Sequence, residues 1–284
     1  MTTRPYVWSV RRELWEYRSI WIAPLCVGGL ALVGFFLTLP GLEGQIARLS
    51  GPDVEEAHNY VHGPYGAGAI LGLGVAFLVG VFYCLDALYG ERRDRSVLFW
   101  KSLPVSDATA VLAKATIPFV ILPVIVFLVT SVAIAIMAGV SALLLDAADT
   151  RMLFHHVQPF GSVVALAYVA IVLALWHAPI YGWLLLVSGR ARRTALLWAV
   201  VPLLAIGTME RILFQSWRFF GFLRYLLLGW IPRAFVSSDD PMTDLVGSLA
   251  PQQLLSTPSL WLGIFVAAAC IAGAIQLRRR GEPL

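Results

Sequence analysis

Long apolar runs, separated by short polar stretches, set the pattern of this chain. A helix needs about 20 apolar residues to cross a bilayer core about 30 Å thick. The runs are continuous and do not alternate every second residue, which favours spanning helices over the strands of a barrel. Six runs are long enough, and we predict spans over about 20–39, 67–89, 110–139, 161–187, 195–213 and 260–277.

The predicted spans contain prolines, and polar loops separate them. Pro118 and Pro123 should kink the third span, and Pro179 lies inside the fourth. The polar, Gly- and Pro-rich residues 40–66 and the shorter stretch 140–160 are interpreted as loops.

The first 19 residues are charged but patterned. Apolar residues recur there at steps of three and four, which places them on one helix face: Val7, Val10, Leu14, Tyr17 and Trp21. We interpret residues 1–19 as an interfacial helix on the membrane surface, and the alternative is an extended start to the first span.

Besides the six long runs, one further apolar segment is too short to cross a membrane. Residues 219–231 carry Arg224 and are followed by Pro232. A re-entrant outer segment over 214–235 fits this pattern, because non-spanning apolar backbone must still be covered by protein.

Composition agrees with a membrane protein. Of the 284 residues, 59% are hydrophobic and only 13% are charged, and the mean hydropathy is +0.77. A soluble domain is about a quarter charged. We therefore expect a single all-α polytopic domain over residues 1–284, with the lipid bilayer as its surroundings and no nucleic-acid partner.

The basic residues orient this topology. If the N-terminus is cytoplasmic, residues 1–19, 87–111, 188–194 and 278–284 face the cytoplasm and hold 14 of the 21 Lys and Arg residues. The outward segments 40–66, 140–160 and 214–258 hold five. The positive-inside rule then predicts that both termini are cytoplasmic.

Ionisable residues within or beside the spans are candidates for function, because burying a charge in lipid is costly. Asp86 and Lys114 lie on neighbouring spans, where they could pair, although snorkelling to the interface is slightly favoured. His177 lies deep in the fourth span and could face a substrate path, although a packing hydrogen bond is favoured. Glu210 and Arg211 mark the outer end of the fifth span, where they could pair with acidic loops or with Arg218, or line an exit.

Known catalytic motifs are absent from the sequence. It has no G-x-x-x-x-G-K-[ST] phosphate loop, no H-E-x-x-H zinc motif and no G-x-S-x-G nucleophile elbow. The three cysteines fall within predicted spans and are interpreted as small buried hydrophobes: Cys26, Cys84 and Cys270.

Two histidine pairs give only a weak metal signal. His155 and His156 are adjacent, and His58 and His62 have i, i+4 spacing but adjoin Gly63-Pro64, where a stable helix is not expected. We interpret both pairs as solvated loop residues and predict no metal site.

The chain is organised around the stretch from Val81 to Asp107. An apolar run ends at Gly90, charged residues follow, and an amphipathic patch ends at Pro104. The sequence ER-x-x-x-S-x-x-F-W-K-S-L-P-V-S within it resembles the cytoplasmic loop of bacterial ABC-2 exporter permeases. The resemblance implies that loop 91–107 forms a coupling helix against an ATPase subunit, through Glu91, Arg92, Arg93, Arg95, Ser96, Phe99, Trp100, Lys101, Leu103 and Pro104.

A second stretch carries the same resemblance. Residues 175–214 contain W-H-A-P-I-Y-G-W-L-L-L-V-S, a basic loop, and P-L-L-A-I-G-T-M-E-R, similar to the fourth and fifth spans of an ABC-2 subgroup. The re-entrant segment after the fifth span is also similar to the outer helices of the family, and with loop 91–107 the resemblance covers most of the chain. His177 has no fixed counterpart in that pattern, so its role stays open.

The resemblance implies a transmembrane permease subunit of an ABC exporter in a bacterial cytoplasmic (inner) membrane. This chain would not be an enzyme: ATP and Mg²⁺ would bind a separate ATPase subunit, and a second permease chain would complete a dimer. Substrate would pass between the first, second and fifth spans. The alternatives are a membrane-embedded enzyme and a structural or regulatory subunit without transport.

Overall fold

The computed structural model describes residues 5–49, 54–94, 105–191, 194–235 and 245–280. Within these ranges every named element is helical, and one isolated bridge joins Phe235 to Leu249. Six helical stretches are long and apolar enough to cross a membrane, as a polytopic all-α protein requires. They are Ser19–Arg48, Glu56–Arg93, Asp107–Leu144, Ala147–Trp176, Ala195–Phe214 and Pro258–Arg280.

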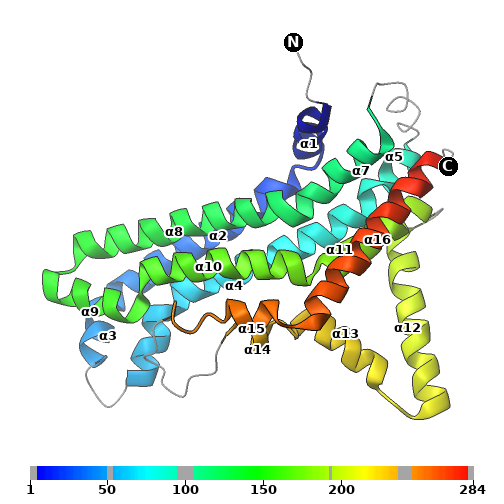
Figure 1. Cartoon of the computed structure of the whole chain (residues 1–284). Coiled ribbons are helices and arrows are strands. Elements are labelled where there is room, and N and C mark those ends of the chain that lie inside the picture. Colours follow the sequence, from blue (N-terminus) through cyan, green and yellow to red (C-terminus); the bar gives the residue numbers. More distant parts are fainter. Residues whose placement is uncertain (1–4, 50–53, 95–104, 192–193, 236–244, 281–284) are drawn as a thin grey trace.

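The helices form an elongated bundle with two distinct ends (Figure 1). We call the end with α1, α5 and the last turn of α16 the terminal end, and the end with α3 and α9 the distal end. In chain order the elements are α1 (Pro5–Glu16), α2 (Ser19–Thr38), η1 (Leu39–Gly41), α3 (Leu42–Arg48), α4 (Val54–Ala87), α5 (Tyr89–Arg93), α7 (Asp107–Thr116), η2 (Ile117–Ile121), α8 (Leu122–Leu144), α9 (Ala147–Val157), α10 (Pro159–Trp176), α11 (Ala178–Arg190), α12 (Ala195–Phe214), α13 (Arg218–Leu228), α14 (Ile231–Ala234), α15 (Pro251–Leu255) and α16 (Pro258–Arg280).

Close helix packing holds the bundle together. Helix α2 packs on α4 and α8, and α11 packs on α4 and α16. At the α11–α16 contact a Cβ added to Gly182 would lie 2.9 Å from the Cα of Ala267. Only a residue without a side chain permits this approach, as is common between helices in lipid.

The prediction of a loop over residues 40–66 is wrong. Helix α3 occupies part of this range, and α4 begins at Val54 and continues through Pro64. Buried Leu42, Ile46 and Val61 pack with residues of α8 and α9 in one apolar cluster. Tertiary burial therefore outweighs the Gly and Pro content of the segment.

The loop predicted over residues 140–160 is also mostly helical. Helix α8 continues to Leu144, and α9 follows almost at once. The Asp146 carboxylate accepts hydrogen bonds from the N–H groups of Ala148 and Asp149, at 2.9 and 2.8 Å, and so caps α9. Leu153 on α9 is buried in the apolar cluster.

Two predicted spans contain breaks. The fourth span is not one helix: α10 ends at Trp176, His177 leaves the helical run, and α11 begins with Pro179 in its first turn. The disturbance expected from Pro118 in the third span is a π-helical turn, η2.

The N-terminal segment forms the predicted helix, α1, which ends before α2 begins. Val10, Leu14 and Tyr17 of the predicted apolar face pack against the largest apolar cluster of the structure. Val7 and Trp21 do not, since they are 54% and 41% exposed. The alternative of an extended start to the first span is therefore wrong.

The segment after the fifth span forms two helices, α13 and α14, both too short to cross a membrane. Helix α13 folds back on α12, where a Cβ added to Gly207 would lie 2.6 Å from the ring of Phe220. Neither helix is among the six stretches of spanning length in the described residues.

Candidate functional site

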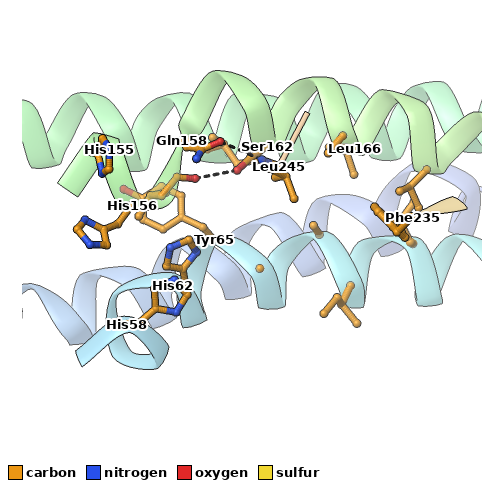
Figure 2. Close-up of a pocket in the computed structure, with 18 of the residues that line it drawn as sticks. His58, His62, Tyr65, His155, His156, Gln158, Ser162, Leu166, Phe235 and Leu245 are labelled. Carbon is orange, nitrogen blue, oxygen red and sulfur yellow. Dashed lines mark hydrogen bonds between the residues drawn. The ribbon is translucent and has the colours of Figure 1, made fainter. Parts of the chain in front are cut away.

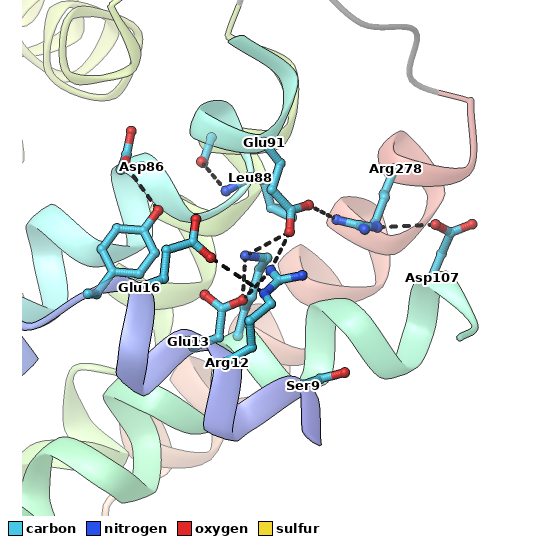
Figure 3. Close-up of polar contacts among 12 residues, drawn as sticks. Ser9, Arg12, Glu13, Glu16, Asp86, Leu88, Glu91, Asp107 and Arg278 are labelled. Carbon is cyan, nitrogen blue, oxygen red and sulfur yellow. Dashed lines mark hydrogen bonds and ion pairs between the residues drawn. The ribbon is translucent and has the colours of Figure 1, made fainter. Parts of the chain in front are cut away.

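Buried charges from four helices meet at the terminal end (Figure 3). Three cations and three carboxylates alternate there, and most are almost completely buried. We call this group the charge cluster; it consists of Arg12 and Glu13 of α1, Glu91 of α5, Asp107 and Lys114 of α7, and Arg278 of α16.

Glu13 forms the α1 side of the cluster. Its Oε1 lies 2.9 Å from Lys114 Nζ and 2.6 Å from Arg12 Nη2, and its Oε2 accepts a hydrogen bond from the Tyr83 hydroxyl at 2.9 Å. Both Glu13 and Lys114 are 1% exposed. A carboxylate removed from water this far is stable only with several charged or hydrogen-bonding partners, and Glu13 has three.

Glu91 and Arg278 form the other side. Glu91 Oε1 lies 2.6 Å from Arg12 Nη2 and 3.2 Å from Lys114 Nζ, and its Oε2 pairs with Arg278. The Nε of Arg278 also donates to Asp107 Oδ1 at 3.1 Å. Arg278 therefore connects a residue that precedes segment 95–104 to one that follows it.

Glu16 lies at the edge of the cluster, partly exposed, with an oxygen 3.5 Å from Arg12 Nε. Burial and then the nearby Glu13 carboxylate raise the pKa of Glu16 above its ordinary value. Lys114 and Arg12 lower the pKa of Glu16, but by less than burial and Glu13 raise it.

Helix α11 holds the α4–α5 junction from the opposite side. The buried Ser188 hydroxyl accepts hydrogen bonds from the N–H groups of Leu88 and Tyr89, at 3.0 and 2.9 Å, and donates to the Leu85 carbonyl at 2.8 Å. The Arg92 guanidinium donates to the carbonyl groups of α11 residue Gly189 and of the adjoining Ala191. The backbone before the 95–104 segment is therefore fixed in place.

Three of the ten residues predicted for ATPase coupling lie in the described part of the chain. Glu91 and Arg92 make internal contacts, whereas Arg93 is half-exposed and pairs with Asp94 at 3.0 Å. The others lie outside the described residues: Arg95, Ser96, Phe99, Trp100, Lys101, Leu103 and Pro104.

The predicted pair of Asp86 and Lys114 does not form. Lys114 turns to Glu13 and Glu91, and its burial also contradicts the snorkelling interpretation. Asp86 accepts a hydrogen bond from the Tyr17 hydroxyl at 3.0 Å. The sequence pattern places both residues near the membrane edge, but each has a closer partner on another segment.

His177 makes the packing contact favoured from its sequence position. Its Nε2 donates to the Leu227 carbonyl of α13 at 3.1 Å, and its ring lies 4.7 Å from that of Phe77. It thereby links the break between α10 and α11 to α13.

Glu210 and Arg211 shape the turn after α12. The Glu210 carboxylate accepts hydrogen bonds from the backbone N–H groups of Arg218 and Phe219, at 3.2 and 2.7 Å, and so caps α13. Arg211 donates to the Gln215 carbonyl at 3.0 Å. The expected partner Arg218 is used, but through its backbone.

Sequence reasoning missed six residues of this region: Arg12, Glu13, Tyr83, Asp107, Ser188 and Arg278. The bonds that define them join residues far apart along the chain, such as Glu13 to Lys114 across 101 positions and Glu91 to Arg278 across 187. No local spacing signals such pairs. The one hint in the sequence was that the predicted cytoplasmic segments hold carboxylates as well as the 14 basic residues, so that ion pairs could form between these segments.

The cations and carboxylates of the charge cluster bind one another, and in the described part of the chain no three His, Cys, Asp or Glu residues are grouped to hold a metal ion. Among the cysteines Cys84 is buried as expected, whereas Cys26 is exposed. Comparison of the chain with protein-family models, with curated proteins and with solved structures found no match in any of the three.

Proposed function

We propose that this chain is the transmembrane permease subunit of an ATP-driven ABC-2-type exporter, with its terminal end in the cytoplasm. The loop and span motifs that resemble this family support the proposal. Six helices of spanning length and the excess of basic residues in the segments assigned to the cytoplasm agree with it.

The observation that carries the proposal is the double contact of Arg278 with Glu91 and Asp107. These carboxylates lie on either side of segment 95–104, which contains the proposed ATPase-binding residues. A force applied to that segment therefore reaches α5, α7 and α16 together, and through Glu13 it also reaches α1.

In the proposed mechanism the ATPase subunit supplies the energy. ATP and Mg²⁺ bind that partner, its closure moves the 95–104 segment, and the permease shifts between inward- and outward-open states. Phe99 and Trp100 anchor the partner, and Arg93, Arg95 and Lys101 meet its acidic surface. The charge cluster moves as one body, because separating its charges would leave them buried and unpaired.

A second copy of the chain is proposed along α12. This helix has the smallest buried share of the six candidate spans, 11%, and stands apart from the bundle in Figure 1. Substrate would pass between α2, α4 and α12 of the two copies. Helix α1, with Trp8 and Trp15 exposed, would lie at the cytoplasmic interface, and α13 and α14 would form the re-entrant outer segment.

The test is purification from native membranes in mild detergent, with the ATPase identified by its stoichiometric recovery. Replacing Phe99 and Trp100 together by Ala should abolish that recovery while the chain still inserts. A matched control replaces the exposed aromatics Trp261 and Phe265 in the first turns of α16, and it should retain the ATPase. Unchanged recovery with the Phe99 and Trp100 variant would overturn the coupling assignment.

A further inference from the structure

A cavity of about 550 Å³ lies toward the distal end, between α4, α8, α9 and α10, and is closed on one side by Trp230, Phe235 and Leu245. Its volume lies within the range of about 300–1,000 Å³ typical of small-molecule sites. It is separate from the charge cluster, because none of the cluster residues lines it.

The cavity is long and differs in chemistry along its length (Figure 2). Its α4 wall extends from His58 to Leu73, about 22 Å at the rise of an α-helix. Helix α10 follows the same direction, so that Ser162 lies near the histidines and Val169 lies deeper. The walls beyond the histidine end are almost entirely apolar, which suits a hydrocarbon chain.

Four histidines gather at one end: His58, His62, His155 and His156. His58 and His62 lie on α4, which is helical where the sequence predicted a loop, and their stacked rings have centroids 3.9 Å apart. The buried Nε2 of His62 has no hydrogen-bond partner among the described residues. A buried polar atom left without a partner is costly, and a ligand at this end would supply one.

The polar end favours an anionic or acceptor group. Among the described residues that line the cavity there is no carboxylate to receive a cation, whereas the imidazole of His62 and the amide N–H₂ of Gln158 can donate hydrogen bonds. A metal ion does not fit, since no three ligands are grouped there among the described residues.

The cavity opens sideways. Ile70 lines it and is nevertheless 73% exposed, on a helix of spanning length. A ligand that dissolves in the bilayer can therefore pass between the helices without leaving the membrane.

We propose that this cavity binds a single-chain amphiphile with an anionic head, its head among the four histidines and its chain along α4 and α10. The proposal is independent of the ATPase-driven function proposed above. The ligand chemistry is shared by free fatty acids and lysophospholipids.

The experiment uses the full chain in phosphatidylcholine nanodiscs with a palmitate analogue that carries a photoreactive diazirine on its chain. Crosslinks should fall on residues 66–73 of α4 and 162–169 of α10. Filling the cavity with Ala69→Trp should reduce this labelling about tenfold, the effect of losing about 1.4 kcal/mol of affinity. Ile171→Trp, on the lipid-facing side of α10, is the matched control and should leave it unchanged.

The head contact is tested with His62→Leu. The wild-type chain should prefer the acid probe over the corresponding fatty alcohol, and this variant should lose the preference by about tenfold. For the cavity-filling test, Leu166→Phe is a second variant that should reduce the photolabelling, and it serves if Ala69→Trp does not fold.

Competition by unlabelled palmitate or by lysophosphatidylglycerol distinguishes the two sources, and displacement by either supports the proposal. Labelling that resists both filling variants, or that neither competitor displaces, would overturn it. Equal labelling by acid and alcohol probes in the wild-type chain would also overturn it.

Discussion

The two ends of the bundle treat buried polar groups in opposite ways. At the terminal end, cations and carboxylates satisfy one another within the chain. At the distal end, histidines line a cavity, and the buried Nε2 of His62 has no partner in the described structure. Polar groups that find partners inside the protein stabilise its fold, whereas those that face a cavity are available to a ligand.

One helix contributes to both ends. Helix α4 carries His58 and His62 in its first turns and Tyr83 and Asp86 in its last. Tyr83 donates to Glu13, and Asp86 accepts from Tyr17. The difference therefore comes from the partners: Glu13 and Tyr17 supply polar groups to the last turns of α4, whereas α3 and α9 pack on its first turns through apolar side chains.

The largest expected effect is on the charge cluster. Lys114→Met should destabilise the chain by about 3–5 kcal/mol, because Glu13 and Glu91 would remain buried without this cation. Thermal unfolding in detergent measures the loss. The control Arg48→Met, at an exposed cation of α3, should stay within about 0.5 kcal/mol. Equal shifts in both variants would contradict the structural role of the cluster.

A smaller loss is expected from the hydroxyl that joins α11 to the α4–α5 junction. Ser188→Ala should cost about 1–3 kcal/mol, since the N–H groups of Leu88 and Tyr89 lose their buried acceptor. Ser131→Ala is the matched control, because the buried Ser131 hydroxyl has no partner in the described structure. Urea unfolding of the two variants should rank Ser188 well above Ser131.

At the distal end the same kind of measurement should show almost nothing. His62→Leu removes a buried nitrogen that has no partner among the described residues, so the free energy of unfolding should change by less than about 1 kcal/mol. Thermal unfolding without added amphiphile checks this. A loss as large as that of Lys114→Met would mean that His62 is a structural residue, and the contrast between the two ends would fail.

The smallest effect is expected at Glu16. A raised pKa means that the folded state favours the protonated form, so stability is highest at low pH and falls as pH rises from the unfolded pKa, about 4.3, through the folded one. Because Glu16 is partly exposed, Glu16→Gln should flatten this dependence by less than about 1 kcal/mol. Melting temperatures of the wild-type chain and of Glu16→Gln, measured between about pH 4 and about pH 7, show this difference in pH dependence.

The spans were predictable because length and hydropathy are local properties. Five of the six predicted runs fall within a helix of spanning length, whereas the fourth, 161–187, overlaps the stretch Ala147–Trp176 only over residues 161–176. The helix at residues 54–66 was not predictable from Gly63 and Pro64, because its stability comes from Val61 and Tyr65 packing on distant helices. The charge cluster depends on bonds across the whole chain, so its residues were individually visible but their pairing was not.

Arg278 also bears on the order in which the protein is made. Its partner Glu91 precedes it by 187 residues, which a ribosome needs about 10–40 s to add at about 5–20 residues per second. During that interval α1, α5 and α7 can meet, but Glu91 and Asp107 must wait for the last helix. Insertion of α16 is then the step that completes the charge balance, and a chain interrupted before it would present an unfinished anionic site to the quality-control machinery of the cell.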